Sequence, residues 1–392
     1  MLDRPMAVMM VLEATFPVQG GGGAESQVFT IGKCLLARGV QITVVVPMVS
    51  TGRQIARENV EGLDVIRIAY PKIRVVGGLI LLIKLGWLLF ARRKHYKVIH
   101  AHIANNMAAV CAVMGALIGT PVLVKLTGMK ELSGGILDRR LSVLTWLKKS
   151  AIKRATMIQA TSSHIRAKLV ECGFEPSRTF LLPNGVDVSR FAGTAKDEAL
   201  RKDLCGDSQL VGVFVGRLAP EKGHDLLLDA WASVFVGRTD VKLVLVGDGS
   251  LRALLEMRVK ELNIEGQVIF TGHTDNVSQF LAIADFGLLT SHNEGLSNAL
   301  LEYMACGLPV IGSRISGTED FVVPEETGLL FESGRSDELA KCLASFSISG
   351  GTALRLMGER ARRRVVSTAS LEAVTGELIR CYESKMNPTS QP

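Results

Sequence analysis

Two carboxylates stand out in the stretch HNEGLSNALLEYMACGLPV at 292–310. Glu294 and Glu302 lie eight residues apart there. Carboxylate oxygens accept hydrogen bonds from sugar and ribose hydroxyls, so such a pair suits a nucleotide-sugar site. Two solvated acids that favour the positive end of a helix would give the same pattern. A second feature is needed to choose between these interpretations.

A pair of cations supplies that second feature. Arg217 and Lys222 stand in one short loop of VFVGRLAPEKGH at 213–224. An arginine can hold a diphosphate through two parallel hydrogen bonds, and a lysine adds a point charge. Together they can neutralise a departing nucleoside diphosphate without a metal ion. The alternative is a solvated basic loop.

Both stretches follow the order strand, turn, helix. The apolar run 286–290 predicts a buried strand, and 298–306 predicts a helix that a glycine and a proline end. Glu294 then lies in the turn, and Glu302 lies in about the second turn of the helix. Both side chains can face one cleft. The amides of 295–298 lie at the positive end of this helix, where a phosphate or a sugar hydroxyl binds favourably.

With these two motifs the sequence resembles the retaining GT-B glycosyltransferases of group 1, which are family 4-like and typical of bacterial polysaccharide and glycolipid synthesis. Three further segments agree and occur in the expected order: GGGGAES at 20–26, LPNGVD at 182–187 and LVGDGSLRALLE at 245–256. Each string alone is weak, because glycine-rich turns occur in many doubly wound folds, but the ordered set is specific. The likeness covers nearly the whole chain.

The resemblance implies transfer of a sugar from a nucleotide-sugar (UDP- or GDP-sugar) to a hydroxyl acceptor, with retention of configuration. Arg217 and Lys222 are expected to stabilise the leaving phosphate, Glu294 to orient the donor sugar, and Glu302 to hold the ribose. These roles make Arg217, Lys222 and Glu294 the expected catalytic residues. The other expected donor-binding residues are Gly21, Gly22, Gly23, Gly216, Gly295, Leu296, Ser297 and Asn298.

Four consecutive glycines at 20–23 follow the first predicted strand. Without side chains they let the backbone approach a diphosphate closely. The alternative is a tight connection between strand and helix and nothing more.

The acceptor side departs from the family pattern. Many members carry His-Gly after the strand that corresponds to 122–126, and here the string is KLTG at 125–128. Thr127 stands in the histidine's position, and its hydroxyl can donate a hydrogen bond but cannot act as a base near neutral pH. His102, at the end of VIHAH, is the second predicted acceptor residue. A strand-end histidine satisfied by the backbone is the alternative.

Length and pattern predict two α/β domains, because 392 residues exceed what one core usually serves. Alternating strand and helix signals favour parallel sheets wrapped by helices. The resemblance implies the GT-B fold, with two Rossmann-like doubly wound domains facing across a cleft. Strands are predicted at 8–12, 41–46, 64–69, 98–102, 121–126, 157–160, 179–182, 211–215, 241–246, 267–270, 286–289 and 309–312.

The predicted division of the chain follows from a polar, charged interval that starts at a Pro-Asn-Gly turn. The acceptor-side domain is expected at 1–185, a linker at 186–206 and the nucleotide-sugar domain at 207–370. The resemblance implies that a C-terminal helix in 371–392 crosses back to the first domain. A disordered tail is expected to follow that helix.

The net charge of +7 comes from dispersed basic residues, and only 5% of the residues are aromatic, which argues against a nucleic-acid partner. Anionic membrane is a better match. The segment GGLILLIKLGWLLFA at 77–91 is shorter than the about 20 apolar residues that span a bilayer. It suits the interface, with Trp87 at headgroup depth beside basic residues. A helix packed on the first sheet is the alternative, and the two interpretations are compatible.

The seven cysteines are odd in number and widely spread, without a Cys-x-x-Cys pair. This pattern predicts a reducing compartment and indicates neither a disulfide framework nor a zinc site. The apolar run 6–12 is short for a signal core and predicts a first strand. We expect a cytoplasmic protein, at the inner face of the cell membrane if it binds lipid. No cofactor or metal is expected, and the partners are the nucleotide-sugar and a sugar or lipid-linked acceptor.

Other classes of protein share parts of this pattern. A nucleotide-sugar epimerase has the same architecture and needs no acceptor. A non-catalytic nucleotide-sugar-binding protein of this fold would lose Arg217, Lys222 or Glu294, and all three are present. A dehydrogenase fits less well, because VGDG at 246–249 lacks the third glycine and lies in the second half of the chain.

Overall fold

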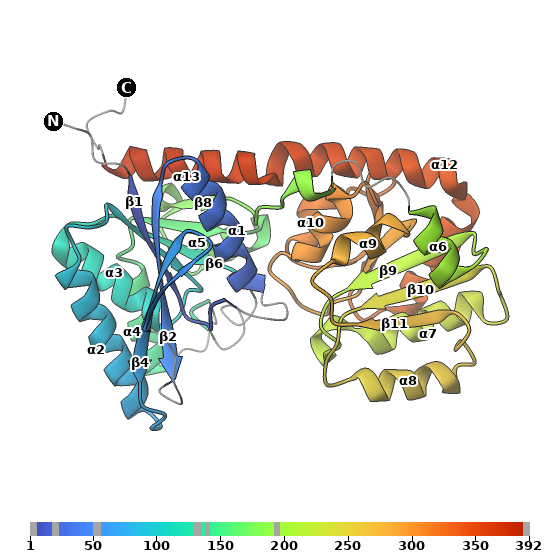
Figure 1. The fold of residues 1–392 in the computed structure, drawn as a ribbon, viewed down its shortest axis with the longest axis horizontal. Helices are drawn as coiled ribbons and strands as arrows, with labels where there is room; N and C mark the ends of the chain where they lie inside the picture. The colour runs from blue at the N-terminus through green and yellow to red at the C-terminus, as the bar shows by residue number, and fades with distance from the viewer. Residues whose placement is uncertain are drawn as a thin grey trace. The chain divides into compact units, whose positions relative to one another are not determined.

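The computed structural model describes residues 6–17, 23–49, 56–128, 135–137, 142–191 and 197–386. The chain divides into two compact α/β units, one made of 1–185 with 371–392 and the other of 186–370 (Figure 1). The segment predicted as a linker, 186–206, lies within the second unit. It is tied there because Phe191 and Cys205 are buried in the core of that unit.

The first unit contains an eight-stranded sheet in the order β3-β4-β2-β1-β5-β6-β7-β8. All neighbouring strands run parallel except the edge strand β3, which is antiparallel to β4. The pattern did not predict β3, because three of its four residues (RENV) are polar and none of the four is buried. The strands are β1 (Ala7–Leu12), β2 (Gln41–Val49), β3 (Arg57–Val60), β4 (Leu63–Tyr70), β5 (Val98–His102), β6 (Val122–Leu126), β7 (Met157–Ala160) and β8 (Thr179–Leu181).

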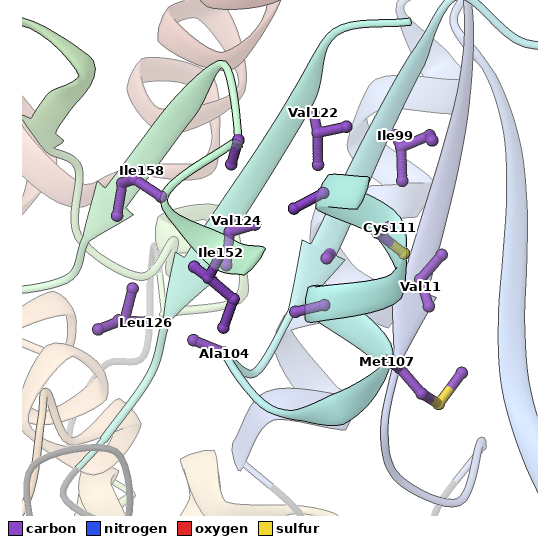
Figure 2. Packing of buried hydrophobic residues seen from close by; sticks show 14 of the residues in the cluster. Val11, Ile99, Ala104, Met107, Cys111, Val122, Val124, Leu126, Ile152 and Ile158 are labelled. Carbon is purple, nitrogen blue, oxygen red and sulfur yellow. The ribbon is translucent and has the colours of Figure 1, made fainter. Parts of the chain in front are cut away.

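Helices cover both faces of this sheet. One core lies under α1 (Gly23–Ala37) and α13 (Leu371–Met386). The opposite core lies under α2 (Val76–Ala91), α3 (Asn106–Ile118), α4 (Val143–Ile152) and α5 (Ser163–Glu171). Figure 2 shows Met107 and Cys111 of α3 among the sheet residues Val11 and Ile99. A 3-10 turn, η1 (Pro176–Arg178), leads into β8.

The helix α2 packs on the first sheet, as predicted. Leu81, Leu85 and Leu89 recur every fourth residue and are buried. The other side of the helix is apolar too, and Trp87 is 69% exposed. Among the described helices, none has both the length and the apolar character needed to cross a bilayer.

The second unit contains a six-stranded sheet in the order β11-β10-β9-β12-β13-β14, and every pairing in it is parallel. The strands are β9 (Leu210–Val215), β10 (Val241–Val246), β11 (Val268–Gly272), β12 (Phe286–Leu289), β13 (Val310–Arg314) and β14 (Gly328–Glu332). All except β14 were predicted. The helices are α6 (Glu198–Cys205), α7 (His224–Phe235), α8 (Arg252–Glu261), α9 (Val277–Ala282), α10 (Asn298–Ala305), α11 (Thr318–Phe321) and α12 (Ser336–Ala369), with 3-10 turns η2 (Val188–Phe191) and η3 (Pro220–Lys222).

Each sheet has one place where the strand order reverses. In the second unit β9 and β12 are neighbours there, and in the first unit β1 and β5 are. The loops that leave the carboxyl ends of such strands diverge, and ligands of open α/β sheets bind in the crevice between them. The loop after β9 carries Arg217 and Lys222, and the loop after β12 carries Glu294. The predicted donor residues therefore lie at the reversal point of the second sheet.

Candidate functional site

The loops after β9 and β12 are joined directly. The Thr290 hydroxyl donates to the carbonyl of Lys222 at 2.9 Å, and the His292 amide donates to the carbonyl of Glu221 at 2.9 Å. Gly223 has a φ of 64°, and a Cβ on it would lie 2.3 Å from the Thr290 carbonyl oxygen. Only glycine allows this approach. The two loops thus hold Lys222 and the residues after β12 in one place.

The ammonium group of Lys222 and the carboxylate of Glu294 form an ion pair at the centre of the site. Their side chains are only 17% and 14% exposed. The Ser291 hydroxyl also donates to Glu294 Oε1. A shielded pair of this kind is more strongly coupled than a surface salt bridge, because water screens it less. The alternative of a solvated basic loop therefore fails for Lys222.

Arg217 has different surroundings. Its side chain is 65% exposed, and Nη2 donates to Glu221 Oε1 at 2.7 Å. The backbone of Arg217 is held more firmly, because its carbonyl lies 3.0 Å from Nε2 of the buried His224. Burial lowers the pKa of His224, so the neutral ring donates to this carbonyl. The guanidinium remains at the surface above a fixed backbone.

Glu302 lies on α10, one helical turn beyond its first residues, and is half-buried. Desolvation raises the pKa of this carboxyl to about 7, and the charge of Arg190 on η2 opposes that rise. The predicted strand, turn and helix that carry Glu294 and Glu302 are confirmed. Whether both carboxylates contact one ligand stays a prediction.

The start of α10 is tightly packed. Ser297 is its N-cap residue, and the Ser297 side chain makes no capping hydrogen bond. Gly295, Leu296 and Ser297 are buried, and Asn298 is half-buried. Gly317 faces this segment with a φ of 80°, and a Cβ on it would lie 2.2 Å from the Gly295 carbonyl oxygen. The turn after β13 thus fixes the backbone where a sugar or phosphate is predicted.

Glycines also bring the loop after β9 close to the loop after β10. The amide of Gly216 donates to the Val246 carbonyl at 3.0 Å. A Cβ on Gly247 would lie 2.0 Å from the Gly216 carbonyl oxygen. The predicted donor residue Gly216 is therefore part of a close backbone contact that side chains would prevent.

Sequence reasoning missed Tyr303, a buried residue of α10 that connects the elements around the site. Its hydroxyl accepts from the Val215 amide at 2.6 Å and donates to the Leu288 carbonyl at 3.3 Å, which ties α10 to β9 and β12. Gly287 makes room for the ring, because a Cβ there would lie 2.4 Å from it. The sequence signal that could have indicated it is Gly287 inside the apolar strand β12, because a glycine within a strand often marks the close approach of another group.

The glycine-rich turn of the first unit is only partly visible. Gly21 and Gly22 lie outside the described residues, and Gly23 is the first residue of α1. Thr127 directly follows β6 at the carboxyl edge of the first sheet and is half-buried. This placement does not test whether Thr127 contacts an acceptor, so that contact stays a prediction.

His102, the second predicted acceptor residue, is buried. It is 1% exposed, and its ring stacks on His100 at a centroid distance of 4.0 Å, in the core under α13. The alternation along β5 directs it inward. Neither ring nitrogen has a hydrogen-bond partner among the described residues, so the alternative of a backbone-satisfied histidine fails. The predicted contact of His102 with an acceptor stays a prediction.

His102 belongs to a buried polar cluster on the neighbouring strands β5 and β6. Its strand neighbour Lys125 is 0% exposed, and the Lys125 ammonium also has no hydrogen-bond partner in the described part of the chain. Burial lowers the pKa of Lys125 to about 7. His100 Nδ1 lies 2.7 Å from the Tyr382 hydroxyl on α13.

No metal centre is found in the described ranges. No group of three or more histidine, cysteine or acidic residues there lies close enough to hold a metal ion. All seven cysteines are free thiols.

Comparison with known proteins adds independent findings. The profile described as "Glycosyl transferases group 1" matches residues 196–364, and "Glycosyltransferase Family 4" matches 21–190. The chain is 27% identical to the N-acetyl-alpha-D-glucosaminyl L-malate synthase of Bacillus anthracis over 297 residues, 74% of this chain and 76% of that protein.

A second curated relative names a lipid-linked acceptor. The chain is 25% identical over 282 residues to the UDP-Gal:alpha-D-GlcNAc-diphosphoundecaprenol alpha-1,3-galactosyltransferase of Escherichia coli, covering 70% of this chain and 72% of that protein. Among solved structures, Anabaena HepE in complex with UDP matches with a TM-score of 0.77 and 20% identity. The match covers 97% of this chain and 100% of that one, and it shows a shared fold.

Proposed function

Because this chain belongs to the group 1 glycosyltransferases of family 4 and has their GT-B fold, we propose that it moves a hexose from a UDP- or GDP-sugar to a hydroxyl acceptor. The acceptor is a lipid-linked or cell-surface polysaccharide intermediate, and the configuration at the anomeric carbon is retained. The observation that supports this most is the shielded Lys222–Glu294 pair at the reversal point of the second sheet.

Charge development explains the division of roles. Departure of the nucleoside diphosphate builds negative charge on the phosphate and positive charge on the anomeric carbon. Lys222 neutralises the phosphate, and Arg217 swings from Glu221 to reach it, since its exposed side chain is held by one salt bridge at the surface. Glu294 accepts hydrogen bonds from the sugar hydroxyls, and Glu302 accepts them from the ribose.

Retention follows from a reaction on one face of the sugar. Lys222 is paired with Glu294, so the two cannot serve as independent acid and base. We therefore assign deprotonation of the acceptor hydroxyl to the departing phosphate. Lys222 and Arg217 take the charge-neutralising role, so the proposed reaction needs no divalent metal.

The acceptor assignment rests on two observations. The Escherichia coli relative carries a diphosphoundecaprenol acceptor in its name. The helix α2 presents Leu79, Ile83 and Trp87 to solvent, at 58%, 63% and 69% exposure, although its opposite side is buried. An apolar helix side with basic neighbours suits anionic membrane. We propose that the protein works at the cytoplasmic face of a membrane.

The test is release of nucleoside diphosphate from UDP-, GDP- and ADP-sugars, with and without a lipid-phosphate acceptor, run beside Glu294→Ala. Release from one donor that the variant abolishes supports the proposal. A single product with the opposite anomeric configuration would overturn retention. If a nucleotide stabilises the fold thermally but no product forms with any acceptor, the chain binds donors without transferring, and the proposal is wrong.

Membrane contact has a separate test. Flotation with vesicles that contain about one third anionic lipid should recover the wild type at low salt and much less of Trp87→Ala plus Ile83→Ala. Leu117→Ala is the control, because Leu117 is 74% exposed on α3, outside this side of α2. Equal recovery of all three proteins would contradict the role of α2.

A further inference from the structure

A groove of about 620 Å³ lies on the first unit among α2, α3 and α4, and the transfer chemistry described above does not use it. Its volume lies within the about 300–1,000 Å³ of typical small-molecule sites. Most of its wall is apolar, with residues from all three helices: Leu82, Val110, Val113, Met114, Leu144 and Leu147. Side chains of this kind recognise hydrocarbon through area removed from water.

One end of the groove is polar and carries a positive charge. Lys148 is the only charged residue in its described lining, and its Nζ donates to Asn105 Oδ1 at 2.6 Å. The Asn105 side chain donates in turn to Glu13 Oε1 at 3.1 Å. The Met107 amide donates to Glu13 Oε2 at 2.8 Å, so Glu13 occupies the start of α3. This network fixes the position of Lys148.

The polar end coincides with the ligand-binding edge of the first sheet. Glu13 follows β1, and Asn105 follows β5, the two strands between which the strand order reverses. Ligands of such sheets bind at this edge. The groove therefore runs from an edge suited to a polar group toward the outer surface of the helices.

The outer rim of the groove is apolar on both sides. On α4, Val143, Leu144 and Trp146 are 76%, 77% and 57% exposed. On α2, Ile83 and Trp87 are exposed as well. Exposed apolar residues concentrated on neighbouring helices mark an interaction surface rather than ordinary scatter. A chain that leaves a bilayer at this rim passes directly into the groove.

We propose that the groove binds the hydrocarbon chain of the lipid-linked acceptor, with Lys148 facing the phosphate at the head of that chain. The occupant is a prenyl-type chain rather than a peptide, since a hydrocarbon has no backbone donors and acceptors to satisfy against an apolar wall. One fixed cation matches one anionic headgroup. This assignment rests on the proposed function, which supplies a lipid-linked acceptor.

Farnesyl diphosphate tests the groove without any transfer step. In equilibrium dialysis below its micelle concentration it should bind the wild type saturably, with one site per chain. Val113→Phe fills the groove from α3 and should weaken binding at least about tenfold. Leu117→Phe adds similar bulk at an exposed position of the same helix and should leave binding unchanged.

The polar end has its own readout. Lys148→Gln should weaken farnesyl diphosphate at least about fivefold and leave farnesol binding unchanged, because only the former carries phosphate. This variant adds no bulk, so it tests the groove even if Val113→Phe fails to fold. Equal loss of farnesyl diphosphate and farnesol would overturn the assignment of Lys148.

Failure of the groove is distinguishable from failure of the proposed function. Thermal stabilisation by UDP or GDP reports the donor site of the second unit in the same samples. No saturable farnesyl diphosphate binding, with nucleotide stabilisation intact, overturns the groove alone. If Val113→Phe abolishes vesicle flotation but keeps farnesyl diphosphate binding, the groove takes bilayer lipid, and the acceptor assignment is wrong.

Discussion

At the scale of single residues, the candidate site contains a lysine and a glutamate that form an ion pair with each other. The Lys222–Glu294 pair is shielded, and Ser291 adds a hydrogen bond to the same carboxylate oxygen. Groups fixed in this way need little rearrangement when charge develops in the transition state. Removal of either partner also leaves the other without its counter-charge.

We therefore predict that Lys222→Ala and Glu294→Gln each lower kcat at least about a hundredfold, the usual effect of losing one fixed electrostatic group. Steady-state release of nucleoside diphosphate measures this. Glu319→Gln is the control, because Glu319 is an exposed glutamate of the same unit that pairs with Arg314. Turnover near the wild-type rate in either site variant would refute the assignment.

Glu302 gives a prediction about pH. Without a bound nucleotide, desolvation raises the pKa of the Glu302 carboxyl to about 7. Only the ionised carboxylate accepts hydrogen bonds from both ribose hydroxyls. Nucleotide affinity should therefore fall as pH drops from 8 to 6, by up to about tenfold per pH unit below 7. Calorimetric titration with UDP or GDP measures it. Glu302→Gln should flatten this part of the profile, while the phosphate's own titration remains in both proteins. An unchanged slope would show that Glu302 does not contact the ribose.

At the scale of elements, Tyr303 joins α10 to two strands and depends on Gly287 for space. This brace positions Glu302 and the start of α10 relative to the loop after β9. Its importance is mechanical, because Tyr303 is fully buried and contacts no solvent.

Gly287→Ala should lower the free energy of unfolding by about 1–3 kcal/mol, since the new Cβ would lie 2.4 Å from the Tyr303 ring. Urea denaturation measures the change. Gly266→Ala is the matched control, because a Cβ there meets nothing within 4 Å. If both substitutions lower the free energy of unfolding by the same small amount, the Tyr303 ring can move away from the new Cβ, and the predicted clash is wrong.

Continuous apolar runs predicted the buried parallel strands, including β9 and β12, because burial on both sides selects apolar residues at every position. The polar edge strand β3 has no such requirement and was missed. The strand-turn-helix order correctly predicted that Lys222 and Glu294 follow neighbouring strands at one edge of the sheet, and their role in donor binding stays a prediction. The burial of His102 was not predicted, because the sequence pattern does not show that α13 covers this part of β5.

At the scale of the whole molecule, the buried cluster under α13 makes stability depend on pH. Lys125 has a folded-state pKa of about 7 and an unfolded-state pKa of 10.5. Between these values the unfolded chain holds the extra proton, so the free energy of unfolding rises with pH. The difference of 3.5 pKa units corresponds to an effect on the order of 5 kcal/mol, as an upper limit.

Lys125→Met should remove this dependence and stabilise the protein most near pH 7. Thermal unfolding of both proteins from pH 7 to 8.5 should show the wild type approaching the variant as pH rises. Comparing the two proteins at each pH cancels the titration of other groups. A constant difference across this range would show that Lys125 stays charged when buried.

The division of the chain has a consequence for its synthesis on the ribosome. Residues 186–370 form one uninterrupted unit, whose ends meet where the Val186 amide donates to the Ala369 carbonyl at 2.9 Å. The first unit lacks α13, and with it Tyr382 over the buried histidines, until residues 371–386 have been translated. The first unit can therefore complete its core only after the second unit has been translated. Until then, the face of the first sheet that α13 covers lacks this helix in the nascent chain.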